Sequence, residues 1–422
     1  MKILHGPLSH PPSLGVLLLA LNVAGFHSPL VSEDWPQFRG PDSDGHARGK
    51  PTPLEWSPTR HVKWKTEVPG LGWSSPSVVG DHLFLTTAVE LEGKLSLRCL
   101  ALDVATGRTL WEKEVFTLDQ VPRIHKKNSH ASPTPLVDQG NVYVHFGTYG
   151  MACLSAKDGS IQWKNQELNY PPQHGSGASP VLYDNRLMVT CDGAKRPFVV
   201  AIDALTGKIA WKTLRSADAK IKFSFATPIV AKVGGQPQLM APGSDQFAAY
   251  DVTTGKEIWQ VRAPGWSVVP QPVIGHGMIF YNHDYDHPEL MGVRLGGRGD
   301  VTQSHVAWKI KKGAPSTPSP LLVGDELYFV SDRGIASCVD AKTGKRHWME
   351  RLRGNYSASP LFANGRILFL NETGLASWVK TGTKFEVLGT NQLPGRTLAT
   401  PAISNGAMYI RTDSSLYRIS ND

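Results

Sequence analysis

The 422-residue chain returns five times to one short pattern, and this repeat limits the possible folds more than any other feature. The first copy, residues 101–111, reads ALDVATGRTLW, and the others lie at residues 154–163, 201–211, 249–259 and 339–348. In every copy a glycine precedes a tryptophan by four residues, and in four copies an aspartate precedes it by eight. Alternating apolar residues favour strands, and the Thr-Gly or Asp-Gly pair favours a tight turn with positive φ. Each copy therefore predicts a β-hairpin.

A series of prolines gives the period of the repeat. Eight prolines, spaced 40 to 59 residues apart, each open a short apolar run: Pro76, Pro135, Pro180, Pro228, Pro272, Pro320, Pro360 and Pro401. One four-stranded sheet fits each interval, which is the period of a β-propeller blade. The sequence predicts an all-β fold, a single eight-bladed β-propeller of four-stranded blades over residues 61–420.

The two ends of this region indicate how the ring closes. The last unit, which begins at Pro401, is one strand short, whereas residues 61–68 (HVKWKTEV) form an outer strand without a blade. Pairing the two would complete the last blade and remove two exposed sheet edges. We expect this N-terminal strand to close the propeller. Tryptophans at the docking position should lock each blade to its neighbour: Trp64, Trp111, Trp163, Trp211, Trp259, Trp308 and Trp348.

The first 32 residues do not share the repeat. Lys2 precedes an apolar run at residues 14–25, which has the length of a signal-peptide core and is short for a membrane span. We expect a signal peptide at residues 1–32, cleaved after Gly25 or after Ser32, and an N-terminal extension at residues 33–60. No cysteine follows the run before Cys99, so a lipid-anchored N-terminus is not expected. The prediction is a periplasmic or secreted protein with no transmembrane segment in its mature chain.

Charge and cysteine content narrow the possible partners. The net charge of +8 is spread over the blades without a basic stripe that alternates with aromatic residues, so nucleic acid is not an expected partner. The four cysteines occupy repeat positions that bring no pair within the roughly 7 Å Cα separation of a disulfide. We expect four buried free thiols in a monomeric protein.

The repeat, with its Ser-Pro strand openings, resembles the pyrroloquinoline-quinone-type (PQQ-like) β-propeller repeat. That repeat is shared by quinoprotein alcohol dehydrogenases and the outer-membrane assembly factor BamB. WPQFRGP at residues 35–41 and SDRGIASCVDAKTGK at residues 331–345 are more specifically similar to exported bacterial proteins with this repeat. The resemblance runs from about Trp35 to Ile419. It implies the fold and leaves the function open, since this fold hosts both enzymes and scaffolds.

Two functions follow from the resemblance. The quinoprotein enzymes imply bound PQQ, a Ca²⁺ ion, a disulfide between adjacent cysteines and a catalytic aspartate. No two cysteines are adjacent here, and no DxDxDG calcium loop is present. We therefore expect an exported, non-catalytic binding or assembly module of the cell envelope, similar to BamB in repeat type and without a cofactor. The alternative is a PQQ-dependent oxidoreductase, with calcium, that acts on alcohols or sugars.

Propeller topology indicates where a partner would bind. Linkers between blades and turns between second and third strands emerge together at one end of the central channel, where irregular loops collect. We expect an envelope protein or a small-molecule ligand at this channel mouth. The candidate residues are the polar and charged ones of these segments: Arg123, His125, Lys126, Lys127, Asn128, His174, Asp192, Lys195, Arg196, Asp245, Asp332, Arg333, Glu372 and Arg396.

A local cluster offers possible metal donors. Residues 282–287 (NHDYDH) contain His283, Asp284, Asp286 and His287, side chains suited to Zn²⁺ or a similar ion. Along an extended loop these side chains would alternate in direction. A polar turn with incidental histidines is the other interpretation.

Overall fold

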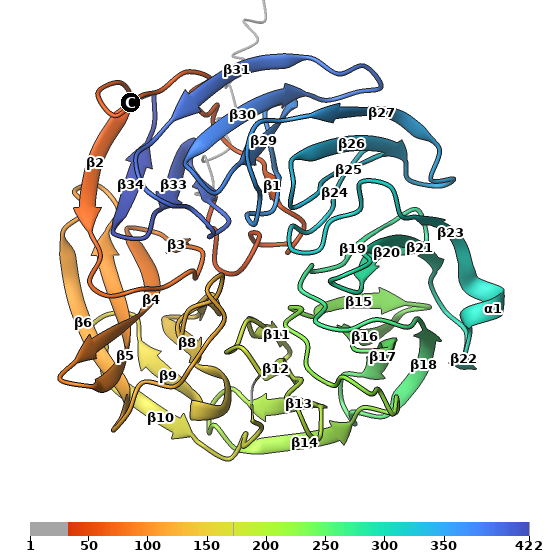
Figure 1. Cartoon of the computed structure of the whole chain (residues 1–422). Helices are drawn as coiled ribbons and strands as arrows, with labels where there is room; N and C mark the ends of the chain where they lie inside the picture. Colours follow the sequence, from red (N-terminus) through yellow and green to blue (C-terminus); the bar gives the residue numbers. More distant parts are fainter. Residues whose placement is uncertain (1–32, 172, 422) are drawn as a thin grey trace, which may run out of the picture. The chain divides into compact units, whose positions relative to one another are not determined.

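Eight sheets follow one another around a central channel in the computed structural model, which describes residues 33–171 and 173–421 (Figure 1). The predicted signal peptide at residues 1–32 lies outside the described residues. Six sheets have four strands and two have a fifth. This arrangement confirms the predicted all-β, eight-bladed propeller.

In seven blades the four main strands run outwards from the channel in chain order, and in the last blade the outermost strand comes from the N-terminal part of the chain; neighbouring main strands are antiparallel. The innermost strands each begin directly after one of the eight prolines: β3 (Ser77–Val79), β7 (Leu136–Asp138), β11 (Val181–Tyr183), β15 (Ile229–Val233), β19 (Val273–Gly275), β24 (Leu321–Val323), β28 (Leu361–Ala363) and β32 (Ala402–Ser404). The second strands are β4 (His82–Leu91), β8 (Asn141–His145), β12 (Arg186–Cys191), β16 (Gln236–Gly243), β20 (Met278–His283), β25 (Glu326–Val330), β29 (Arg366–Leu370) and β33 (Ala407–Arg411).

The outer half of each blade holds the repeated hairpin. The third strands are β5 (Lys94–Asp103), β9 (Met151–Ser155), β13 (Phe198–Asp203), β17 (Gln246–Asp251), β21 (Glu289–Arg294), β26 (Ile335–Asp340), β30 (Leu375–Lys380) and β34 (Ser415–Ile419). The outermost strands are β6 (Thr109–Leu118), β10 (Ile161–Asn165), β14 (Ile209–Leu214), β18 (Glu257–Arg262), β23 (Val306–Ile310), β27 (Arg346–Arg351), β31 (Val387–Gln392) and β2 (Val62–Glu67). A short 3-10 helix, η1 (Gly147–Tyr149), lies between β8 and β9.

The ring closes as predicted. Strand β2 pairs antiparallel with β34, with Trp64 opposite Arg418 and Glu67 opposite Ser415. Figure 1 shows β2 beside β34, although the two strands stand at opposite ends of the described chain. The last blade is thus completed by residues some 350 positions away in the sequence.

The N-terminal extension is built into the propeller as well. Trp35, which is fully buried, exchanges backbone hydrogen bonds of 2.7 and 2.9 Å with Val78 of β3. The carbonyl of Pro36 accepts the N–H of Val137 at 2.8 Å, and β1 (His46–Ala47) pairs parallel with β28. Through its backbone, the extension therefore pairs with the backbone of the innermost strands of three blades.

The predicted docking tryptophans lie between blades. In six of the seven, the indole N–H donates to a main-chain carbonyl of the following blade at 2.8 to 3.1 Å: Trp64 to Val104, Trp111 to Ala156, Trp163 to Ala204, Trp211 to Val252, Trp308 to Ala341 and Trp348 to Gly382. In five blades the turn glycine, with positive φ, lies against that indole, and a Cβ there would be 2.5 to 2.8 Å from the ring. The glycine of the repeat therefore serves both the turn and the docking of the preceding tryptophan.

Trp259 differs because the next blade lacks the Thr-Gly turn. In its place, β22 (Gly299–Asp300) and α1 (Thr302–His305) lie outside β18, with which β22 pairs in parallel (Figure 1). The indole N–H of Trp259 donates instead to Gln238 of its own blade at 3.0 Å. The ring still packs in a buried cluster with Ile279 of the following blade.

The cysteines are buried and free, as expected from their repeat positions: Cys99, Cys153, Cys191 and Cys338. Burial raises the pKa of Cys153 to about 12, so this thiol stays protonated at neutral pH. Within the described part of the chain, no helix is long and apolar enough to cross a membrane.

Candidate functional site

A cavity of about 300 Å³ occupies the central channel. Its walls are the extended segments that precede the innermost strands. The residues three positions before all eight strand-opening prolines line it, and so do the residues one position before six of them, because alternate residues of an extended chain point to the same side. The cavity therefore has two layers, built by the same short segment of successive blades.

The deeper layer is a ring of hydroxyl groups, here called the hydroxyl ring. It consists of the serines and threonines directly before six of the prolines: Thr134, Ser179, Thr227, Ser319, Ser359 and Thr400. Each oxygen accepts a backbone N–H from the preceding blade, at 2.9 to 3.0 Å. These bonds tie blade to blade around the channel.

Gln271 holds the equivalent position in the fifth blade. Its backbone N–H donates to Ser319, but its side-chain amide is buried, and neither polar atom has a hydrogen-bond partner within the described residues. A buried amide without partners is costly, so this position needs water or another polar group.

The shallower layer combines hydroxyls with apolar side chains. Its polar members are Ser132, Thr317 and Ser357, and its other members are Trp73, Gly177, Phe225, Val269 and Leu398. The indole N–H of Trp73 is buried and has no acceptor within the residues that the structure describes.

Loops complete the cavity at its mouth, here called the rim: His125, Lys127, Asn128, His174, Trp266, Ser267, Tyr285 and Asp286. Phe38 of the N-terminal extension also lines the cavity. The extension bonds to strand residues that follow the prolines, whereas the rim belongs to loops on the other side of both layers. Phe38 therefore marks the inner end of the cavity.

The rim contains an ion pair across the channel mouth. Lys127, from the linker between the first two blades, bonds to Glu372 of the seventh blade at 2.8 Å, and Ser357 donates to the same carboxylate at 2.6 Å. Burial disfavours both charges, but the hydrogen bonds outweigh it, so the pKa of Glu372 is lowered and that of Lys127 is raised. Both groups are charged at neutral pH.

Two histidines of the rim lie beside aromatic side chains. The rings of His125 and His174 meet edge to face at 5.6 Å, and His174 meets Phe223 in the same way at 5.2 Å. Phe223 in turn contacts Trp266 at 5.4 Å. Partial burial, and then the neighbouring His174, lower the pKa of His125, which favours its neutral form.

The structure brings several predicted residues together at the mouth. His125, Lys127, Asn128 and His174 line the cavity, and Glu372 reaches it through Lys127. Two more predicted residues contact neighbours of the cavity: Asp332 accepts the Thr317 hydroxyl at 2.6 Å, and Arg396 donates to the Lys126 carbonyl at 3.2 Å.

Other predicted residues do not line the cavity. Asp245 accepts the N–H of Gly265 at 2.8 Å within a loop contact. The others have exposed side chains: Arg123, Lys126, Lys195, Arg196 and Arg333.

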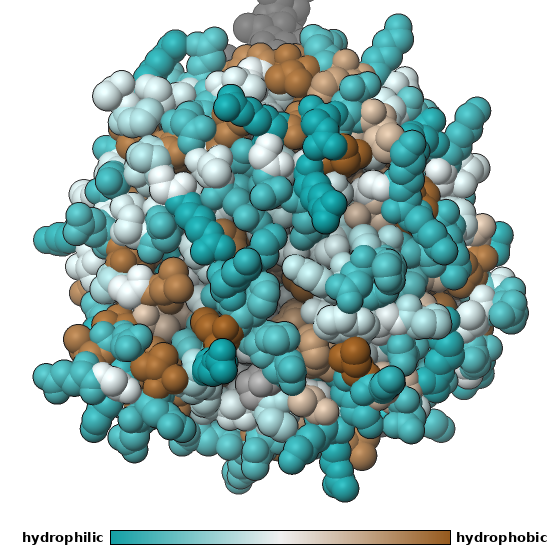
Figure 2. Space-filling view, viewed as in Figure 1, coloured by the Kyte–Doolittle hydropathy of each residue, from teal (hydrophilic) through white to brown (hydrophobic). Residues whose placement is uncertain are grey.

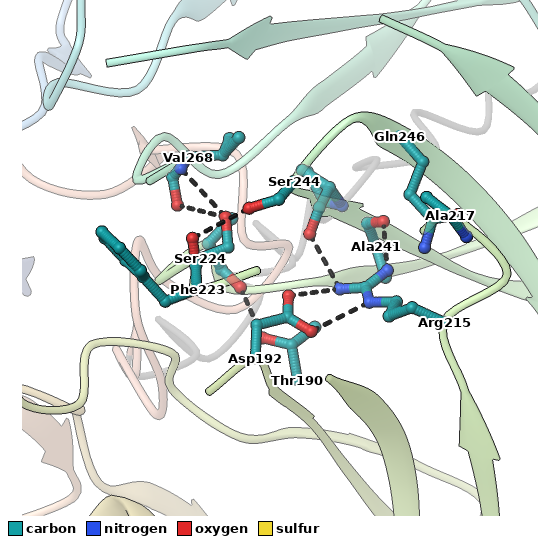
Figure 3. Close-up of polar contacts among 12 residues, drawn as sticks. Thr190, Asp192, Arg215, Ala217, Phe223, Ser224, Ala241, Ser244, Gln246 and Val268 are labelled. Carbon is teal, nitrogen blue, oxygen red and sulfur yellow. Dashed lines mark hydrogen bonds and ion pairs between the residues drawn. The ribbon is translucent and has the colours of Figure 1, made fainter. Parts of the chain in front are cut away.

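Asp192, which the sequence placed at the mouth, lies in the interior instead (Figure 3). Both of its carboxylate oxygens bind Arg215, at 2.7 and 3.0 Å, and both side chains are almost completely buried. Arg215 also donates to the carbonyls of Ala241 and Pro242 in the next blade, at 2.9 Å each. This ion pair links the third and fourth blades, and the buried Asp192 carboxylate is not accessible to a ligand or to another protein.

The proposed metal donors do not converge. Among the described residues, no three His, Cys, Asp or Glu side chains are arranged to hold a metal ion. His283 is buried and bonds to Glu289 at 3.0 Å, whereas Asp286 and His287 are exposed. The buried His283 and the exposed Asp286 and His287 therefore do not form one set of donors.

Sequence reasoning missed both layers of the cavity and the aromatic residues Trp73, Phe225 and Trp266. A signal was present, since a serine or threonine precedes seven of the eight prolines. From the sequence alone, that dipeptide indicates only the opening of a strand.

Eight four-stranded blades, with tryptophans docked on turn glycines and a channel lined by residues before each proline, define a propeller of PQQ-like repeats. The comparison with protein families agrees. The chain belongs to the family described as outer membrane protein assembly factor BamB, whose sequence model matches residues 57–233, 196–293 and 293–415. The predicted resemblance is confirmed.

Curated relatives include both enzymes and an assembly factor. A polyvinylalcohol dehydrogenase of a Pseudomonas species is 24% identical over 243 residues, which make up 48% of this chain and 36% of that protein. The quinohemoprotein alcohol dehydrogenase ADH IIB of Pseudomonas putida is 28% identical over 260 residues, 60% and 30% of the two chains. BamB of Legionella pneumophila is 24% identical over 179 residues, 40% and 44% of the two chains. The chain thus spans less than half the length of these relatives.

Solved structures give the same two classes. BamB from Moraxella catarrhalis has a TM-score of 0.60 at 14% identity, covering 85% of this chain and 99% of that one. A europium-containing methanol dehydrogenase has a TM-score of 0.63 at 12% identity, covering 91% and 90%. At these identities the likeness concerns the fold alone.

Proposed function

We propose that this protein is a non-catalytic binding module of the bacterial cell envelope, which docks an envelope protein on the loops around the channel mouth. The observation behind this proposal is a set of exposed cations on those loops: Arg123, Lys126, Arg196 and Arg333. No ion pair involves any of them among the described residues, so their charges are available to an acidic partner surface.

The character of the surface supports a polar interface. The face in view in Figure 2 is mainly hydrophilic, with hydrophobic residues in separate small groups. Interfaces that form and dissociate are no more apolar than the rest of a protein surface. The family description, an assembly factor of outer membrane proteins, gives the class of partner to test first.

The donor set of the cavity also favours this proposal over quinone catalysis. Asp286 is the single carboxylate among the described lining residues, and the cysteines are free, so the residues do not fit a calcium-bound quinone held on a disulfide. Addition of PQQ with Ca²⁺ is the matching test. Turnover of alcohols or sugars, or a rise in melting temperature worth about 2.7 kcal/mol at a hundredfold excess over Kd, would favour the enzyme.

Charge reversal at the rim tests partner docking. We expect the double variant Arg123→Glu, Lys126→Glu to reduce recovery of the outer-membrane assembly machinery about tenfold in affinity purification from solubilised envelopes. The control reverses two exposed lysines of the outer hairpin turns, Lys208→Glu and Lys256→Glu, and should leave recovery unchanged. Equal recovery with both double variants contradicts the proposal.

A further inference from the structure

We propose that the central cavity is a binding site for a neutral saccharide of one or two rings. This inference goes beyond the docking of an envelope protein, which concerns the exposed loops. It depends on three properties of the cavity: its free hydrogen-bond donors, the pairing of its charges, and its aromatic walls.

The hydroxyl ring supplies donors that point around a circle. Each of its oxygens already accepts a backbone N–H, so its hydrogen is left to donate, and none has a protein acceptor among the described residues. The orphaned indole N–H of Trp73, a residue of the cavity wall, adds a further donor. A ligand with oxygens at several positions around its own ring can meet donors arranged in this way. Hydroxylated sugar rings have that pattern.

The charges of the site favour a neutral ligand. The one lysine of the lining, Lys127, is already paired with Glu372, and Asp286 lies at the exposed mouth. Below the rim, the described lining contains hydroxyl, aromatic and aliphatic side chains alone. An anion drawn into this region would lose hydration without gaining a counter-ion from the lining below the rim, which is unfavourable. The nearby guanidinium of Arg396, 5.6 Å from the centre of the Trp73 ring, belongs to an exposed side chain outside this lining.

Aromatic faces complete the site. Trp73, Phe225 and Trp266 line three parts of the wall, and Phe38 lines the inner end. Aromatic rings provide a large apolar surface on which the C–H face of a sugar ring can lie, while polar groups at the ring edge are satisfied by donors. A volume of about 300 Å³ is at the small end for ligand pockets, which limits the occupant to one or two rings.

The test is titration of the full-length purified protein with neutral sugars, followed by calorimetry and tryptophan fluorescence. The panel contains glucose, galactose, mannose, N-acetylglucosamine and their common disaccharides, with glucuronate and PQQ plus Ca²⁺ as comparison ligands. We expect at least one neutral sugar to bind with one-to-one stoichiometry, and glucuronate to bind at least about tenfold more weakly than glucose. Failure of every neutral sugar to bind, tighter binding of glucuronate, or displacement of the sugar by PQQ overturns the proposal.

Two variants locate the site. Trp73→Phe keeps the ring and removes the orphaned N–H, and should weaken binding about five- to tenfold. Val269→Phe fills the cavity without removing a hydrogen bond, and should abolish binding. The matched control, Trp111→Phe, makes the same change at a blade-docking tryptophan, where it lowers the melting temperature but leaves the sugar Kd unchanged. Wild-type affinity in both cavity variants shows that the sugar binds elsewhere and overturns the proposal.

The sugar-binding experiment and the docking experiment test the two proposals independently. The rim reversal Arg123→Glu, Lys126→Glu should leave sugar binding intact, and Val269→Phe should leave recovery of the assembly machinery intact. Either proposal can therefore fail alone.

Discussion

The outer and inner layers of this propeller are both built from a repeat, but they use their polar groups differently. In the outer layer, the tryptophan N–H and the turn aspartate are satisfied within the protein, as in Trp211 with Val252 and Asp203 with Thr206. In the inner layer, the hydroxyl ring accepts one hydrogen bond per residue and keeps a donor in reserve. A repeat whose polar groups are all paired holds blades together, whereas a repeat with unused donors can also bind a ligand.

The largest effect should come from removing a docking tryptophan. Trp211→Ala deletes a ring that is 9% exposed and packs on the next blade, and should lower the free energy of unfolding by about 3 to 5 kcal/mol. This change in the free energy of unfolding can be measured by denaturant titration. Leu205→Ala, at a side chain 71% exposed, is the control and should change stability by less than about 0.5 kcal/mol. If Trp211→Ala lowers the free energy of unfolding by less than about 1 kcal/mol, the docking tryptophans are not the main stabilising contact between blades.

The glycine beneath that tryptophan should rank second. Gly255 has φ +71°, and an added Cβ would lie 2.5 Å from the Trp211 ring, so Gly255→Ala should cost about 1 to 3 kcal/mol. Gly277→Ala is the matched control, since Gly277 has φ +69° and nothing within 4 Å of the added atom. The difference between the two variants isolates the packing contribution. Equal losses would mean that the turn conformation alone requires the glycine.

Each residue of the hydroxyl ring should contribute less to the free energy of unfolding than the docking tryptophan or its glycine. Thr227→Val keeps the shape of the side chain but leaves the N–H of Ser179 without its acceptor, at a cost of about 1 to 2 kcal/mol. Thr227→Ser keeps the hydroxyl and should lose clearly less. If both variants lose the same stability, the methyl group and not the hydrogen bond matters at this position.

The smallest effect is the pH dependence of the outer turns. Hydrogen bonds from Thr206 lower the pKa of Asp203 below its usual 3.8, so its contribution to stability is complete above that value and is lost as pH falls through the lower folded pKa. Asp203→Asn keeps an acceptor oxygen and removes the charge. Melting temperatures measured from neutral to acid pH should show a smaller acid-induced decrease in the variant than in the wild type. Parallel curves would contradict this contribution.

Much of the fold could be predicted because its signals are local and repeated. The Thr-Gly turn, the tryptophan four residues after the glycine and the proline before each inner strand are each defined within a dozen residues. The eight prolines indicate the number of blades, and the one missing strand indicates the closure by β2. The exception, Trp259, arose where an insertion replaced the local turn.

The candidate site was less accessible to sequence reasoning because it depends on side-chain direction. Asp192 and Lys127 both occupy loops at the same end of the propeller, yet Asp192 turns inwards to Arg215 and Lys127 reaches across the mouth to Glu372. Likewise, a serine or threonine before a proline is a common local feature. Its role in a ring became visible only with the blades assembled.

The sequence by itself determined the all-β architecture, the number of blades and the strand that closes them, because turn chemistry and hydrophobic period act between near neighbours. The tertiary structure alone decided which polar groups are paired and which remain free. Closing the ring brings together residues such as Thr134 and Ser179 from different blades, and burial then fixes the cost of each unpaired donor. The cavity and its chemistry arise from that convergence.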